Sequence, residues 1–412
     1  MPQPIHHHTF ANGLTLLAER MEHVRSATLN VLVPAGCVYD PPAKLGIASV
    51  MTELIVRGAG KRDSRELTMA LDNLGVDRDE SVATVHVRFW GGTVAKNLPA
   101  ALDIYADILR RPHFPDDEME PVRALALQDL QSLEDEPRHK IMIELRKHHF
   151  PPPLGQDRRG TVASVEKLTI EDIRAHHRRM FRPNGTILSV AGNIDWPQLK
   201  DQVERLFGDW PRGDDPSLRL GTPPGRQEHF SKETTQTQIG IAYDSVPIGH
   251  PDYYAALAAV HVLGSGGSSS RLFTEVREKR GLCYSVSANY HMLKDRASVL
   301  CYAGTTTERA QETLDVTLRE VHRLTEGVEP EELVRIQAGI KSALIMQQEW
   351  TSARANMLAS DWYYLARVRS IEEIQSAVNS LTPQRIVDHL RQHPPKDFTI
   401  VTLGAQPLKL PA

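Results

Sequence analysis

The stretch GGTVAKNLPAALD, from Gly91 to Asp103, occurs a second time in this chain in related form. The stretch AGTTTERAQETLD, from Ala303 to Asp315, aligns with it at an offset of 212 residues, with matching glycine, threonine, leucine and aspartate. Further matches at offsets of 212 and 213 residues follow in the same order: Glu120, Val122, Arg123 and Ala126 with Glu332, Val334, Arg335 and Ala338, and LTIEDIRAHH (168–177) with LTPQRIVDHL (381–390). Because self-similarity at a fixed spacing marks a repeated structural unit, the sequence predicts two similar halves.

Each half of the 412-residue chain is long enough to form a domain of its own. The segment WPRGDDPSLRLGTPPGRQEH, residues 210–229, is polar and rich in proline and glycine, which is typical of a linker. We therefore predict an N-terminal domain at residues 1–210, a linker at 211–228 and a C-terminal domain at 229–412.

Strand-like and helix-like segments alternate in each half. In the first half, apolar residues recur with the period of a strand in three segments and at helical spacing in two others. The strand-like segments are GLTLLAER (13–20), ATLNVLVPAG (27–36) and ATVHVRFWGG (83–92), the helical ones LPAALDIYADILRR (98–111) and EMEPVRALALQDLQSLEDE (118–136), and NGTILSVAGN (184–193) follows as a buried strand. This order predicts an α+β fold of two homologous domains, each a mainly antiparallel sheet with helices packed on one face.

The composition is that of an ordinary globular protein, with 41% hydrophobic and 24% charged residues. The net charge of −4 argues against nucleic-acid binding, which needs clustered positive charge. Cys37, Cys283 and Cys301 are odd in number and lack metal-site spacing, which favours a reducing compartment. The sequence shows neither a signal peptide nor an apolar stretch long enough to span a membrane. We therefore expect a soluble cytoplasmic protein that contacts no membrane.

Several segments match a known family in order along the chain. The most specific is GSSSRLFTEVREKRGLCYSVSANY, residues 267–290; NGLTLLAE, GIASVMTELIVRGAGKRDSREL, HFPPPLGQDRRGTV and LTIEDIRAHHRRMFRPNGTILSVAGNI accompany it. Through them the chain resembles the M16 metallopeptidases, the insulinase and mitochondrial processing peptidase group, over essentially its whole length. The resemblance implies two α+β halves of the M16 fold, closing like a clamshell on an unfolded peptide, with zinc in one half.

The zinc motif of that family is altered in this sequence. The family places H-x-x-E-H on a helix, where two histidines bind zinc and the glutamate activates water, and a distal glutamate is the third ligand. On this chain the histidine positions fall on Ser49 and Glu53, the catalytic glutamate on Thr52 and the distal glutamate on Asp129. No histidine remains, and a threonine hydroxyl is no general base near neutral pH. We therefore expect no metal in this chain.

Two carboxylates remain at the altered motif, on Glu53 and Asp129. They offer a hard cation an incomplete set of ligands, since calcium takes six to eight oxygens and magnesium a full octahedron. A solvated acidic pair is the alternative interpretation. The family's Asn-Ala pair near the substrate strand is also replaced, by Asp79 and Glu80.

The second half keeps the family's Arg and Tyr, seven residues apart, as Arg277 and Tyr284. In active members, as the resemblance implies, these side chains donate hydrogen bonds to the scissile carbonyl or the developing oxyanion. The sequence predicts a helix that stops at Gly281 and then a strand, so that a turn brings the pair together. The alternative is structural: Arg277 pairs with Glu275 or Glu278 on a solvated helix, and Tyr284 is a core aromatic.

These features predict the zinc-free subunit of a two-chain M16 peptidase, inactive alone. A homologous partner chain with H-x-x-E-H would bring the zinc, and this chain would act in trans through Arg277 and Tyr284. The expected substrate is an unstructured peptide that adds as a strand to an exposed sheet edge. The alternative is an inactive M16-fold protein that holds a peptide or partner without cutting it. The sequence also leaves a homodimer open, and it shows no Ser-His-Asp or Cys-His set for an autonomous hydrolase.

Overall fold

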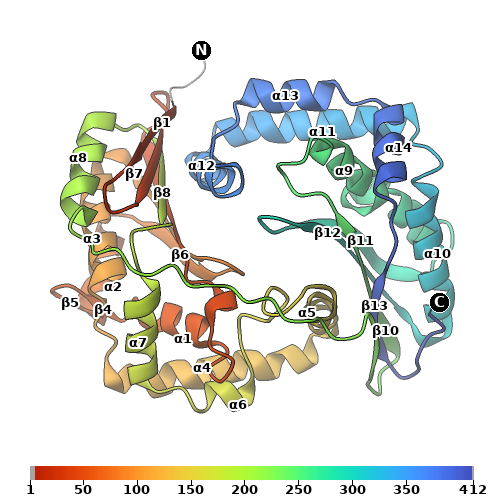
Figure 1. Cartoon of the computed structure of the whole chain (residues 1–412), viewed down its shortest axis with the longest axis horizontal. Helices are drawn as coiled ribbons and strands as arrows, with labels where there is room; N and C mark the ends of the chain where they lie inside the picture. The colour runs from red at the N-terminus through yellow and green to blue at the C-terminus, as the bar shows by residue number, and fades with distance from the viewer. Residues whose placement is uncertain (1–4, 411–412) are drawn as a thin grey trace. The chain divides into compact units, whose positions relative to one another are not determined.

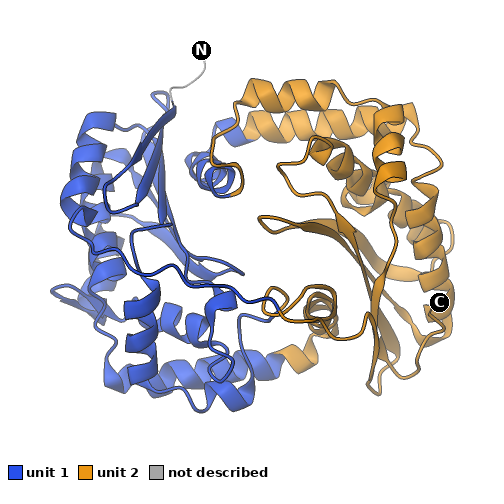
Figure 2. Cartoon of the chain, viewed as in Figure 1, with its two compact units in different colours: residues 1–132, 156–220, 347–363 blue, residues 133–155, 221–346, 364–412 orange. Residues whose placement is uncertain are grey.

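The computed structural model describes residues 5–410 and divides into two compact units (Figure 2). Unit 1 comprises residues 1–132, 156–220 and 347–363, and unit 2 comprises residues 133–155, 221–346 and 364–412. Neither unit is continuous in sequence, because each includes one segment from the other half of the chain. Among the described residues, no helix is both long and apolar enough to cross a membrane.

Unit 1 is built on a mixed sheet of six strands. In spatial order these are β1 (Ile5–Thr9), β2 (Thr15–Arg20), β8 (Ile187–Gly192), β3 (Ser26–Val33), β7 (Val87–Val94) and β6 (Asp77–Val82). Only β2 and β8 run parallel, and the other neighbours are antiparallel. Strands β1 and β6 form the two edges of the sheet.

Helices of unit 1 cover one face of this sheet, and Figure 1 shows α2, α3 and α8 among them. They are α1 (Ile47–Leu54), α2 (Ser64–Asn73), α3 (Leu98–Arg110), α4 (Met119–Ser132), α6 (Val162–Val165), α7 (Ile170–Met180) and α8 (Trp196–Phe207); a two-stranded β4 (Gly58–Ala59) and β5 (Arg62–Asp63) precedes α2. Capping boxes fix the start of three of them: Asp63 with Glu66 on α2, Thr161 with Ser164 on α6, and Thr169 with Asp172 on α7. The result is a single apolar core between sheet and helices.

A helix from the second half of the chain, α12 (Thr351–Leu365), packs on the opposite face of the sheet. Along β8, Leu188 and Val190 enter the main core, whereas the hydroxyl of Ser189 donates a hydrogen bond to the carbonyl of Ala355 at 2.7 Å. The fully buried guanidinium of Arg354 binds the carboxylate of Glu19 at 2.6 Å. This paired buried charge fixes α12 to β2, since either group alone would be costly to bury.

Unit 2 repeats the sheet of unit 1 without its outermost strand. The order β11 (Cys283–Met292), β12 (Ala297–Thr306), β10 (Gln236–Ser245), β13 (Thr399–Gly404) and β9 (Gln227–Ser231) corresponds to β6, β7, β3, β8 and β2. Only β13 and β9 are parallel. Strand β13 begins 212 residues after β8, as the sequence repeat predicts. The α+β class with mainly antiparallel sheets is confirmed.

The helices of unit 2 follow the same plan. They are α9 (Tyr253–Val260), the π-helical turns η5 (His261–Ser265) and η7 (Phe273–Glu278), α10 (Ala310–Arg323), α11 (Pro330–Gln348), α13 (Ile371–Asn379) and α14 (Pro383–Gln392). On the opposite face lies α5 (Pro137–His149), a helix from the first half of the chain. Its residues Ile141 and Leu145 pack against Ala242 and Leu300 of the sheet.

Packing thus exchanges α5 and α12 between the two sheets. Figure 2 shows α5 in the colour of unit 2 and most of α12 in the colour of unit 1. The boundaries 1–210, 211–228 and 229–412 describe the sequence repeat and stay a prediction. The compact units are defined by contacts in the folded chain, and the sequence repeat carries no information about those contacts.

Candidate functional site

Helix α1, which carries the altered zinc motif, begins at a buried carboxylate. Asp40 accepts hydrogen bonds from the backbone N–H groups of Gly46 and Ala48, at 2.8 and 3.3 Å. Burial raises the pKa of Asp40 to about 7, and the two hydrogen bonds oppose that shift. Gly46 has a positive φ of 89°, and a Cβ there would lie 2.4 Å from the carbonyl oxygen of Arg159. The loop that carries Arg159 therefore lies directly against the start of the helix.

The side chains at the three altered positions on α1 have environments that are common on a surface helix. The hydroxyl of Ser49 donates to the carbonyl of Arg158 at 2.7 Å, and the buried hydroxyl of Thr52 donates to the carbonyl of Ala48 at 2.8 Å. Glu53 is exposed and makes no ion pair within residues 5–410. Thr52 is thus bonded back to its own helix, a common use of a threonine hydroxyl at a helical position.

The distal position of the motif is neutralised by an arginine. The carboxylate of Asp129, on α4, accepts a hydrogen bond from Nε of Arg159 at 2.7 Å. Zinc sites use histidine, cysteine or carboxylate ligands, and here a hydroxyl, a free carboxylate and an ion-paired carboxylate stand in their place. Glu53 and Asp129 belong to no group of three metal-ligand side chains in the described part of the chain. The residues present do not fit a zinc ion.

A pocket of about 450 Å³ lies beside α1 in unit 1. Its charged lining consists of Glu53, Asp79, Glu80, Asp129, Arg158 and Arg159. Glu80 is held by Arg78 through two hydrogen bonds of 2.9 and 3.0 Å; burial raises its pKa, and Arg78 opposes that shift. Two of the four carboxylates are therefore paired with arginines, and Glu53 and Asp79 remain unpaired among the described residues. The pocket is acidic, but it does not hold a cage for a divalent cation.

The second candidate region is the turn between η7 and β11 in unit 2. Arg277 lies in η7, and Gly281 stops the helix with a positive φ of 59°. The N–H of Gly281 donates to the carbonyl of Arg277, which is the bond of an αL C-cap, and the N–H of Leu282 donates to the carbonyl of Val276. The predicted helix, stop and strand are confirmed at this turn. Its π-helical form was not predicted, and single π turns are frequent at functional sites.

Tyr284 occupies a bulge at the start of the edge strand β11. Cys283 and Ser285 pair with β12, but the register shifts between them, so Tyr284 has no partner. Its side chain is 85% exposed. The guanidinium carbon of Arg277 lies 5.2 Å from the centroid of the Tyr284 ring and 4.7 Å from that of Phe273. Bulges commonly redirect a side chain beside an active site, and this bulge places the phenol in solvent next to the guanidinium.

The structural alternatives for this pair are wrong. An 85% exposed Tyr284 is not a core residue. Glu275 binds Lys279 and Arg280, at 2.7 Å each, and Arg277 forms no ion pair within residues 5–410. The guanidinium and the phenol are therefore hydrogen-bond donors without acceptors among the described residues, which suits the stabilisation of negative charge on a substrate oxygen.

The predicted site residues thus fall into two groups. Ser49, Thr52, Glu53 and Asp129 line one pocket of unit 1, and Arg277 and Tyr284 meet at one turn of unit 2. Sequence reasoning missed Arg159 and Phe273, the residues that neutralise Asp129 and support Arg277. The spacing of Phe273 and Arg277, four apart on a helical segment, was the available signal for the second contact. No signal marked the first, since 30 residues separate its partners. The catalytic roles stay predictions.

Comparison with known proteins identifies the family. Residues 15–157 match the family described as insulinase (peptidase family M16), and residues 167–340 match the family described as peptidase M16 inactive domain. An uncharacterized zinc protease of Bacillus subtilis, YmxG, is 25% identical over 406 residues, which cover 97% of this chain and 98% of the relative. An uncharacterized zinc protease of Rickettsia felis is 23% identical over 395 residues, which cover 96% and 95%.

Solved structures share the fold. A peptidase M16 inactive domain from Pseudomonas fluorescens superposes with a TM-score of 0.90 at 19% identity, covering 99% of both chains. A protease from Helicobacter pylori superposes with a TM-score of 0.88 at 19% identity, covering 98% of this chain and 100% of that one. The family matches extend over both halves of the sequence repeat, and the chain belongs to the M16 peptidase family.

Proposed function

We propose that this chain is the zinc-free subunit of a two-chain M16 peptidase. The proposal depends on a contrast between two regions. At the zinc-motif position Asp129 is ion-paired with an arginine, whereas the donor pair in the second half is free to bind a ligand. Asp129 is bound to Arg159, whereas Arg277 and Tyr284 lie together at an exposed turn with no acceptor among the described residues. The curated relatives are called zinc proteases, which supports peptide hydrolysis as the reaction of the complex.

The partner is a homologous chain that carries H-x-x-E-H. A second copy of this chain would bring the same Ser49 and Glu53, so a homodimer does not supply the missing ligands. In the complex the zinc of the partner would supply the activated water. The residues of this chain would donate hydrogen bonds, Arg277 from its guanidinium and Tyr284 from its hydroxyl, to the carbonyl oxygen of the substrate as negative charge develops on it.

The substrate is an unstructured peptide. Among the described strands, β6 and β11 lie at sheet edges and pair with β7 and β12 alone, although the carbonyl of Ala288 on β11 already accepts a hydrogen bond from the hydroxyl of Ser265. An extended peptide can add to such an edge through main-chain hydrogen bonds. Tyr284 lies at the first residues of β11, so a peptide on that edge has its backbone next to the donor pair.

The test is a cleavage assay with purified components. The chain alone, a homologous chain carrying H-x-x-E-H, and their mixture are incubated with a library of unstructured peptides, and products are followed by mass spectrometry. We expect cleavage by the mixture, its loss on chelation, and no cleavage by this chain alone. Chelator-sensitive activity of the isolated chain would contradict the proposal.

A non-catalytic peptide-binding protein is the second candidate function. It is favoured by the misfit of Ser49, Thr52 and Asp129 to zinc and by the description of the matching family as an inactive domain. The same assay separates the two functions. If the mixture binds peptides, measured by fluorescence anisotropy, but never cleaves them, the binding function holds and the trans-acting role of Arg277 and Tyr284 is wrong.

A further inference from the structure

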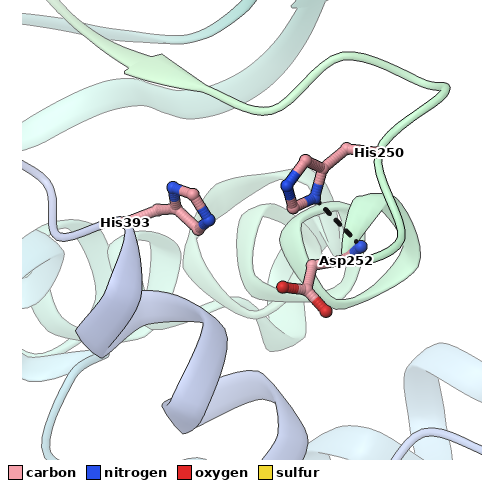
Figure 3. Close-up of side chains that lie close together, drawn as sticks. All are labelled: His250, Asp252 and His393. Atoms are coloured by element: carbon pink, nitrogen blue, oxygen red, sulfur yellow. Dashed lines mark hydrogen bonds between the residues drawn. The ribbon is translucent and has the colours of Figure 1, made fainter.

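Unit 2 contains a cluster of metal-ligand side chains that the proposed peptidase function does not use. His250, Asp252 and His393 each offer one ligand atom, and these atoms all lie within 4.8 Å of one another. Figure 3 shows a ring nitrogen of His250 and one of His393 pointing toward each other, with the carboxylate of Asp252 beside them. In the described part of the chain, this is the one group of three such side chains with this spacing.

Two packed elements bring these residues together. His250 and Asp252 lie in the loop that leads into α9, and His393 lies at the C-terminal cap of α14. Asp252 stands at the N-cap of α9, but its side chain makes no capping hydrogen bond. An aspartate at this position usually binds the free N–H groups of the first turn. Here the carboxylate turns instead toward α14, where its partners are Arg385 and His389.

A further buried histidine faces the same carboxylate. His389 is 4% exposed, and its Nδ1 has no hydrogen-bond partner among the described residues, although it lies 3.8 Å from Oδ2 of Asp252. His389 and His393 are four residues apart at the end of α14, and their ring centroids are 5.1 Å apart. Histidines at this spacing share one face of a helix, which is a common arrangement for binding a metal.

We propose that His250, Asp252 and His393 bind a zinc ion at the junction of α9 and α14. Two imidazole nitrogens and one carboxylate oxygen form a donor set that zinc uses when it keeps a fourth position open. Calcium and magnesium prefer sets composed of oxygen, so this cluster selects against them. The fourth position is filled by water, or by His389 after a rotation of its ring.

Binding of zinc requires a local contraction of the cluster and the loss of one hydrogen bond. Tetrahedral zinc with bonds of about 2.1 Å places its ligand atoms about 3.4 Å apart, compared with the upper limit of 4.8 Å found here. His393 is exposed, so its ring can turn without disturbing the core. Nδ1 of His250 accepts a hydrogen bond from the N–H of Asp252 at 3.1 Å, which orients the ring and leaves Nε2 toward His393 (Figure 3). Binding through Nε2 moves the ring proton to Nδ1 and ends that hydrogen bond.

Arg385 sets the strength of the site. Its guanidinium donates to Oδ1 of Asp252 at 2.7 Å, which leaves Oδ2 for the metal. A positive charge bound to a ligand weakens the attraction between that ligand and a cation. Arg385 also orients that carboxylate, so the site is expected to have moderate affinity. Bound zinc would link the loop before α9 to the end of α14, and binding to the native state alone stabilises that state.

The test uses the full chain, stripped of metal and titrated with ZnCl₂ in a calorimeter. We expect one equivalent to bind and to raise the melting temperature, and Co²⁺ in its place to give the visible absorption of a tetrahedral site. His250→Asn and His393→Asn should each weaken binding by about 100-fold or more, since loss of even an outer partner of a metal site costs about 10- to 100-fold.

The control is the triple variant His6→Asn, His7→Asn and His8→Asn, which removes the run of three consecutive histidines near the N-terminus. Zinc binding should persist in this variant. The proposal is overturned if the unaltered chain binds no zinc, or if the triple variant alone loses binding. Circular dichroism verifies folding, and the exposed His393 provides an informative variant even where His250→Asn does not fold.

Discussion

The α1 region of unit 1 and the η7–β11 turn of unit 2 differ in how many of their polar side chains have partners. At α1, Ser49 and Thr52 donate to backbone carbonyls and Asp129 is bound by Arg159. At the turn, the guanidinium of Arg277 lies over the ring of Tyr284, and neither side chain binds an acceptor among the described residues. Exposed donors bind water that a ligand can displace, so the pair at the turn is available to a ligand, whereas the bonded groups at α1 are not.

The largest expected effect concerns catalysis in the mixture with the zinc-bearing homologue. Arg277→Ala and Tyr284→Phe should each lower kcat about 100- to 1000-fold, the usual cost of losing one oxyanion donor. Because Tyr284 is exposed and Arg277 makes no ion pair with a described residue, the melting temperature of this chain should not change. Arg319→Ala, at an exposed position of α10, is the matched control and should keep full activity. Unchanged kcat in both site variants would show that Arg277 and Tyr284 do not take part in catalysis.

A pair of glycines tests how tightly each region is packed. Gly46→Ala combines a positive φ with a Cβ 2.4 Å from a backbone oxygen, so it should cost about 3 kcal/mol of stability. Gly281→Ala has a positive φ too, but the nearest atom to its added Cβ is Nη1 at the end of the Arg309 side chain, at 3.6 Å, so it should cost only about 1 kcal/mol. Urea unfolding of both variants measures the difference. Equal costs would show that the loop at Arg159 yields to the added methyl group.

The buried carboxylate at the start of α1 predicts a dependence of stability on pH. Because the pKa of Asp40 is raised to about 7, the folded chain binds a proton that the unfolded chain releases near pH 4. The stability contributed by this group is therefore complete below about pH 4 and lost as the pH rises through about 7, on the order of 4 kcal/mol.

Comparison with Asp40→Asn isolates this effect from other groups. Burial lowers the pKa of His176 to about 3 and that of His177 to about 4, so these side chains act in the opposite direction, and stability falls as the pH drops below about 6.5. They are present in both proteins and cancel in the difference. The difference in unfolding free energy between the two proteins should change between pH 4 and 7. A constant difference across this range would show that Asp40 is ionised throughout.

The smallest effect is expected from the ion pair that occupies the distal ligand position. Asp129 is exposed, so Asp129→Asn should lower stability by less than about 1 kcal/mol. The variant should leave cleavage by the mixture unchanged, because no metal step runs through this residue. A loss of activity comparable to that of Tyr284→Phe would show that the α1 pocket takes part in catalysis, contrary to the proposal.

Much of the fold could be predicted from the sequence, since apolar periodicity and capping residues act locally. The repeat of GGTVAKNLPAALD as AGTTTERAQETLD predicts two α+β sheets of like order, and β8 and β13 lie at the predicted offset. The exchange of α5 and α12 was not predicted. Their helical patterns give an apolar face but not the sheet that the face will cover, because that choice depends on contacts distant in sequence such as Arg354 with Glu19.

The site divides in the same way. The sequence by itself determined that histidine is missing at positions 49 and 53 and that Arg277 and Tyr284 are kept, because residue type alone decides which atoms can bind zinc or donate to an oxyanion. Only the tertiary structure decided that Asp129 is neutralised by Arg159 and that a bulge turns Tyr284 into solvent beside Arg277. Ion pairing and strand register are set by distance and packing in the folded chain, and neither has a local signature in the sequence.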